Sequence, residues 1–135
     1  MFKPIIYLGA ISLSGLLIVK YKVPPNPDKQ GWWIPAPEIN YGEDPAEEVA
    51  KLVKHLGLTA ENQSLVGVDS FMANEAWHLV FKYKVRAEGN VAHDNIEDHR
   101  WVTLDSLPPA DTFAHGNWER ELSRYFLSLE LQDYL

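Results

Sequence analysis

Residues 43 to 58 carry acidic and then basic side chains at the spacing of a helix. Glu43 and Glu47 come first, and Lys51, Lys54 and His55 follow within two turns. Carboxylates so placed could hold a hard divalent cation such as Mg²⁺, which needs oxygen ligands. Ammonium groups would repel that cation, each by about 1 kcal/mol in water. Lys51 and Lys54, with protonated His55 at lower pH, could instead supply positive charge directly to a phosphorylated ligand.

The local sequence predicts the helix that positions these side chains. Asp44 is a good N-cap, Pro45 suits the first helical position, and Gly57 ends the helix. Apolar residues recur at helical spacing and would pack on a sheet: Val49, Leu52, Val53 and Leu56. We therefore expect a helix over about residues 45 to 56.

The opposite face of this helix is charged. Glu47 and Glu48 fall in the first turn, where they suit the positive end of the helix dipole. Glu47 and Lys51 are four residues apart in the favourable order, which predicts an ion pair between them. This pair gives the residues a plain alternative role, in which they form a solvated helix face whose charges cancel.

Strand-like segments surround the helix. Residues 5 to 7 and 16 to 23 are apolar and flank a turn at 12 to 15, which favours a hairpin over a signal peptide or membrane anchor. Residues 62 to 72 and 76 to 87 resemble two paired strands, 99 to 104 a further strand, and 88 to 98 a polar turn. Residues 117 to 130 show helical periodicity. This order predicts an α/β (α+β) layer fold.

The segment GWWIPAPEINYGEDPAEEVAKLVKHLGL, residues 31 to 58, resembles a Nudix box, and nearly the whole chain follows the Nudix order. The Nudix box is a Gly, five residues, a Glu, seven residues, and then Arg-Glu-apolar-any-Glu-Glu-any-Gly-apolar. The preceding strand pair with its Trp loop, and the later HRWVTLDSLPP, are similar to other Nudix segments. The resemblance implies one Nudix-like domain over residues 1–135, an α/β/α sandwich with a mixed sheet between helices.

The box is degenerate where the family binds its metal ion. Alignment on Glu43 and Gly57 requires one deletion and puts Pro37 in place of the first Gly. The expected glutamate cluster then falls on Lys51, Lys54 and His55. In active members these carboxylates bind Mg²⁺ or a similar cation, which neutralises the diphosphate and orients water. We therefore expect no metal site, no catalytic residues and no cofactor here.

Other residues offer weaker candidates. Glu38 and Glu43 flank the loop before the helix, and Glu43 matches the isolated Glu of the box. Trp33 could stack on a nucleobase, although a Trp beside a loop is more often buried in a core. The acidic HDNIEDH segment, residues 93 to 99, resembles a solvated turn more than a metal site, because its spacing matches no known ligand geometry. The predicted ligand-binding set is Lys51, Lys54, His55, Trp33 and Glu38.

Composition limits the partners. The formal net charge of -7 argues against binding to nucleic acid or an anionic membrane, both of which are held by Lys and Arg. The absence of cysteine suits a reducing compartment, so we expect a cytoplasmic protein. Members of the family often form homodimers, but we see no exposed apolar stripe in the sequence that demands one.

Two functions follow from the resemblance. The first is a noncatalytic Nudix-fold protein that binds a nucleotide-like small molecule or a protein partner. The second is an active hydrolase of nucleoside diphosphate-linked compounds that uses Mg²⁺ or Mn²⁺ on relocated carboxylates, with Glu43 and Glu47 as the first candidates and Glu38 and Glu97 as others. The missing glutamate cluster favours the first.

Overall fold

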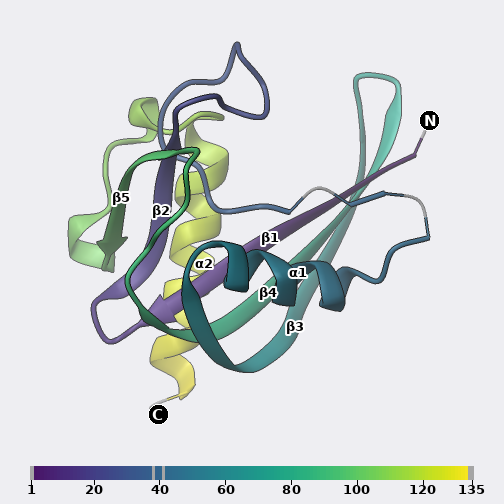
Figure 1. Ribbon diagram of the computed structural model, residues 1–135. Helices are drawn as coiled ribbons and strands as arrows, with labels where there is room; N and C mark the ends of the chain where they lie inside the picture. Colours follow the sequence, from purple (N-terminus) through teal and green to yellow (C-terminus); the bar gives the residue numbers. More distant parts are fainter. Residues whose placement is uncertain (1, 38, 41, 134–135) are drawn as a thin grey trace.

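The computed structural model describes residues 2–37, 39–40 and 42–133, and within them it contains a mixed sheet of five strands (Figure 1). The strands are β1 (Phe2–Ser12), β2 (Gly15–Tyr21), β3 (Leu58–Ala73), β4 (Ala76–Gly89) and β5 (Ile96–Val102). Their order in the sheet is β3-β4-β1-β2-β5. β1 and β4 are parallel, while the other neighbours are antiparallel. The expected mixed sheet is confirmed.

Two helices cover opposite faces of the sheet (Figure 1). The helix α1 (Pro45–His55) buries Val49 and Val53 in one core, and α2 (Asn117–Asp133) buries Leu122 and Phe126 in the other. Leu52 is half-buried against the α1 core, so the apolar stripe faces inward as predicted. Two short 3₁₀ helices, η1 (Leu104–Ser106) and η2 (Ala110–Thr112), precede α2. The α/β/α sandwich is therefore confirmed.

A glycine allows α2 to lie close to the sheet. A Cβ atom on Gly9 of β1 would overlap the ring of Phe126, a side chain that is completely buried. Because buried side chains are close-packed, that ring has little room to move. Gly9 is therefore a packing requirement of the α2 face.

Several element boundaries differ from the expectation. β3 begins at Leu58, directly after α1, instead of at residue 62. β5 begins at Ile96 and ends at Val102, so part of the predicted polar turn is strand, while Leu104 already belongs to η1. β5 is an edge strand with one exposed side, and exposed strand residues need no apolar pattern. The N-terminal hairpin is confirmed, and no helix in the described residues is long and apolar enough to cross a membrane.

The β3–β4 hairpin extends beyond both helices to form an arm (Figure 1). Large apolar side chains on this arm are exposed, with relative exposures of 47% for Val68, 38% for Phe71, 69% for Met72 and 49% for Trp77. These residues fall within the two expected paired strands, and the strand pattern does not show which of their side chains the helices cover. Their exposure follows from the length of the arm, most of which extends past α1 and α2, although the ring of Phe71 contacts Trp118 of α2.

Candidate functional site

The helix α1 has the local structure that its sequence predicts. Oδ1 of Asp44 accepts a hydrogen bond of 3.0 Å from the backbone N–H of Ala46, and Pro45 occupies the first turn. Gly57 follows the helix with φ at +80°, a value that glycine adopts without strain. These contacts fix which side chains of α1 lie toward the preceding loop and which toward β3.

Lys51 forms its ion pair with Glu48 and not with Glu47. Its Nζ atom lies 2.9 Å from Oε1 of Glu48, whose side chain is only 12% exposed. The hydrogen bond to Glu48 is the main reason that the pKa of Lys51 is raised, and the charge of Glu43 adds to it. The prediction of a Glu47–Lys51 pair is therefore wrong, because Lys51 pairs with Glu48 instead. Much of the Lys51 charge is already compensated within the protein.

Glu43 orders the loop in front of α1. Its Oε1 atom accepts a hydrogen bond of 2.8 Å from the backbone N–H of Asn40. A hydrogen bond with the Glu48 carboxyl group, and then the one from Asn40, lower the pKa of Glu43. Glu43, Glu48 and Lys51 thus form one polar cluster, the Glu43–Glu48–Lys51 cluster, in which an ammonium group accompanies two carboxyl groups.

Lys51 and Lys54 also line a groove of about 690 Å³ between α1 and the start of β3. Thr59 and Glu61 are on its opposite wall. Nε2 of Gln63 donates a hydrogen bond of 2.9 Å to the carbonyl oxygen of Ala46, which ties β3 to the helix. His55 is exposed in the last turn of α1 and is not among the residues that line this groove.

A second hollow of about 470 Å³ lies at the N-terminal end of α1 and is called the α1 hollow below. It is lined by Phe2, Pro4, Ile39, Asn40, Gly42, Glu43, Pro45 and Phe81. Its walls come from β1, β4 and the loop before α1, so it borders the Glu43–Glu48–Lys51 cluster through Glu43. A concave, mostly apolar site with a few polar groups is the usual form of a small-molecule site.

Trp33 is only 7% exposed, and its indole N–H donates a hydrogen bond of 3.1 Å to the carbonyl oxygen of Lys29. Its ring contacts Tyr21 and His115 edge-on, at centroid distances of 6.1 and 4.9 Å. This packing is that of a core side chain, which leaves little ring surface for a ligand. Glu38, the other predicted contact in this region, lies outside the described residues.

A buried carboxylate stands at the start of α2. Glu119 has no exposed surface, and its Oε1 accepts a hydrogen bond of 2.7 Å from the backbone N–H of His115. Its Oε2 lies 2.5 Å from Nδ1 of the same residue. Both carboxylate oxygens of Glu119 have their partners on His115, within one turn of chain. The Glu119–His115 contact therefore holds the chain in place where it enters α2. His115 is isolated in the sequence, and no motif there points to this pair.

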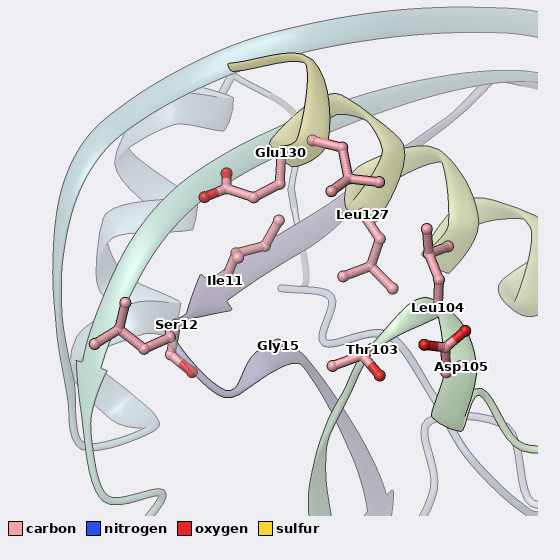
Figure 2. A pocket seen from close by; sticks show the side chains of 10 residues that line it. Ile11, Ser12, Gly15, Thr103, Leu104, Asp105, Leu127 and Glu130 are labelled. Atoms are coloured by element: carbon pink, nitrogen blue, oxygen red, sulfur yellow. The ribbon is translucent and has the colours of Figure 1, made fainter. Parts of the chain in front are cut away.

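A third hollow, of about 430 Å³, lies far from α1 between the β1–β2 turn, η1 and the end of α2 (Figure 2). Ile11 and Leu127 form its apolar part, and Glu130 lies at its edge. Glu130 is bound by Lys84 at 2.7 Å and by Arg86 at 2.8 Å. No candidate from the sequence analysis lies here.

Among the described residues, no three side chains of His, Cys, Asp or Glu come together in a way that could hold a metal ion. The acidic segment at residues 93 to 99 makes local hydrogen bonds, in which Nδ1 of His93 accepts from the N–H of Asn95 and Oδ1 of Asp98 accepts from the N–H of His99. The first contact belongs to the turn before β5, and the second lies within β5.

Solved structures identify the fold. A MutT Nudix hydrolase from Burkholderia pseudomallei matches with a TM-score of 0.69 and 20% identity, over 95% of this chain and 97% of that one. A MutT protein from Methanosarcina mazei Go1 matches with a TM-score of 0.69 and 14% identity, over 93% and 92%. An ADP-ribose pyrophosphatase from Streptococcus suis matches with a TM-score of 0.64 and 16% identity, over 95% and 91%. The chain has the Nudix fold.

No protein-family model and no curated protein sequence matches this chain. At these identities the structural likeness establishes the fold alone. What the chain does with the fold therefore has to be argued from its own residues.

Proposed function

We propose that this Nudix-fold protein is a noncatalytic binding protein that takes a nucleotide-like ligand in the α1 hollow without a metal ion. The observation that carries the proposal is the 2.9 Å ion pair between Lys51 and Glu48. An ammonium group already accompanies the two carboxyl groups of the Glu43–Glu48–Lys51 cluster. A divalent cation would have to displace it and would still be repelled by Lys54.

Without a bound metal ion, the helix offers no Lewis acid for a diphosphate and no means of lowering the pKa of an attacking water. The remaining carboxyl groups of the cluster are engaged, since Glu43 holds the loop at Asn40 and Glu48 holds Lys51. Such a protein would keep the binding cleft of the fold but would not catalyse hydrolysis.

The α1 hollow supplies contacts for a flat, partly apolar ligand. Phe2 and Phe81 offer aromatic surface, and Asn40, which also lines the hollow, carries a donor and an acceptor in its side chain. Stacking of a base on an aromatic side chain contributes about 1–3 kcal/mol. A nucleoside fits this combination of aromatic surface and amide group.

Phosphate groups add little to this binding. Glu43, Asp44, Glu47 and Glu48 all lie at the N-terminal end of α1, and Lys51 is already paired with Glu48. Lys54 and the exposed His55 are the remaining positive candidates on the helix, and Glu61 lines the same groove as Lys54. We expect that the ligand is held through its base and sugar.

Isothermal titration calorimetry with adenosine and with ADP, both in the presence of a chelator, tests the proposal. We expect both ligands to bind with similar affinity, and Phe81→Ala to weaken both by about tenfold or more. Phe71→Ala, which removes an exposed ring on the other face of the sheet, is the matched control and should have no effect. Binding that requires Mg²⁺, or that Phe81→Ala leaves unchanged, would refute it.

The second candidate is an active hydrolase with relocated carboxylates. The close approach of Glu43 and Glu48 favours it, because paired carboxylates are what a Mg²⁺ or Mn²⁺ site needs. In that case substrate and metal ion together would have to displace Lys51. Metal-dependent turnover that Glu43→Gln abolishes would choose this function over the first.

A further inference from the structure

The outer strand of the sheet has an open edge on the arm. β3 is the last strand of the sheet, and from Gly67 to Ala73 it pairs with β4 in continuous register. The register shifts of β3 lie earlier, between Glu61 and Ser64 and between Leu65 and Gly67. Among the described residues, no strand pairs with the other side of residues 67 to 73. This stretch is therefore a regular edge of seven residues.

The stretch GVDSFMA lacks the usual protection of a strand edge. Natural edge strands are blocked by lysine, proline, bulges or a covering element. Residues 67 to 73 contain no lysine and no proline, and their one charged residue, Asp69, is paired with Lys82 at 2.8 Å. An unprotected edge of this kind tends to add a further strand.

The turn geometry shows which backbone groups are available. Asn74 and Glu75 have φ values of 50° and 62°, so they form a two-residue hairpin turn of type I′. The closing residues of such a turn bond to each other, and hydrogen-bonded pairs then alternate along the hairpin. Val68, Ser70 and Met72 consequently direct their N–H and C=O groups to the open edge.

We propose that a second copy of this chain pairs its β3 antiparallel to this edge, with Ser70 opposite Ser70 of the second copy. In this register Val68 of each copy lies opposite Met72 of the other, on the same face of the sheet. Val68 is 47% exposed and Met72 69% exposed, so the pairing covers apolar surface as well as satisfying backbone groups.

Charge favours a second copy at this place. The chain has a net charge of -7, so two copies repel each other wherever their acidic surfaces meet. Between Gly67 and Leu79 the only acidic residues are Asp69, which Lys82 neutralises, and Glu75 at the turn. The arm is thus a region where two copies approach at low electrostatic cost. The exposed apolar side chains of one arm can also pack against the same side chains of the other arm.

The mass of the full-length protein, measured by sedimentation or light scattering over a concentration series, tests the proposal. We expect a dimer that dissociates on dilution, because the paired stretch is short. Met72→Lys places an ammonium group in the interface, and we expect it to raise the dimer dissociation constant by roughly tenfold or more. Val23→Lys adds the same charge at a residue that is 71% exposed outside the arm, and it should leave the constant unchanged.

Hydrogen exchange locates the interface independently. The amides of Val68, Ser70 and Met72 should exchange slowly in the dimer and rapidly in Met72→Lys. A protein that stays monomeric at every concentration would overturn the proposal. So would a dimer in which these three amides exchange rapidly, or one that Met72→Lys and Val23→Lys affect equally.

Discussion

The ammonium group of Lys51 lies 2.9 Å from Oε1 of Glu48, at the place on the Nudix helix where Glu43 also approaches. The protein thus supplies its own cation to a pair of carboxyl groups. This relationship offsets the mutual repulsion of the acidic residues at the N-terminal end of α1. It also predicts what happens when the ammonium group is removed.

Lys51→Met should expose the Glu43–Glu48 pair to solution cations. With the internal ammonium group gone, Mn²⁺ can approach two carboxyl groups, and we expect a weak site with a dissociation constant of about 10⁻⁴ to 10⁻³ M. The wild-type protein should show no binding in this range. Electron paramagnetic resonance of free Mn²⁺ measures the difference.

Lys54→Met is the matched control for this experiment. Lys54 lies one turn further along α1, and its side chain makes no ion pair among the described residues. Its removal should leave Mn²⁺ binding at the wild-type level. Equal gains in the two variants would mean that net charge, and not the Lys51–Glu48 contact, controls cation binding.

Acid should weaken the fold through Glu130. Burial alone would raise the pKa of Glu130, but the hydrogen bonds and charges of Lys84 and Arg86 outweigh it and hold the pKa below its ordinary value. The stabilisation is complete above the unfolded-state pKa of about 4.3 and is lost as the pH falls through the lower folded-state pKa. Glu130→Gln should lower the free energy of unfolding at neutral pH by about 1–3 kcal/mol.

Thermal unfolding between about pH 3 and pH 7 measures this effect. The difference between wild type and Glu130→Gln should shrink toward the acid end. Glu121→Gln is the control, because Glu121 is 52% exposed and its 3.5 Å contact with Arg124 lies at the surface. A constant difference at every pH would show that Glu130 acts by packing and not by charge.

Gly9→Ala should destabilise the protein. The added Cβ atom would overlap the buried ring of Phe126, and overpacking of this kind costs about 1–3 kcal/mol. Gly67→Ala is the comparison, since the atoms that its Cβ would meet belong to the ends of the Tyr125 and Lys82 side chains. Denaturant unfolding should show the larger loss for Gly9→Ala, and equal losses would contradict the packing argument.

The sequence predicted α1 closely because its determinants are local. Asp44, Pro45 and Gly57 set the ends of the helix, and the apolar stripe sets its buried face. The ion-pair partner of Lys51 was missed because both Glu47 and Glu48 are within reach on a helix. Glu43 approaches Glu48 from the preceding loop. Helical spacing does not predict this contact, because Glu43 lies outside the helix.

The α1 hollow could not be predicted from the sequence. Phe2 and Phe81 line the hollow together only because β1 and β4 are parallel neighbours, a pairing between segments far apart in the chain. Residues 76 to 87 resemble a strand, but that pattern does not show on which face of the sheet Phe81 lies. The exposure of Met72 and Trp77 has the same origin, since it depends on how far the arm extends beyond the helices.

Turnover of nucleoside diphosphate compounds shows directly whether this protein is noncatalytic. Purified protein is incubated with ADP-ribose and nucleoside di- and triphosphates, with Mg²⁺ and with Mn²⁺, and the products are separated by chromatography. We expect no hydrolysis above the chelator control, because Lys51 and not a metal ion would accompany Glu43 and Glu48. Metal-dependent hydrolysis that Glu43→Gln or Glu48→Gln abolishes would contradict it.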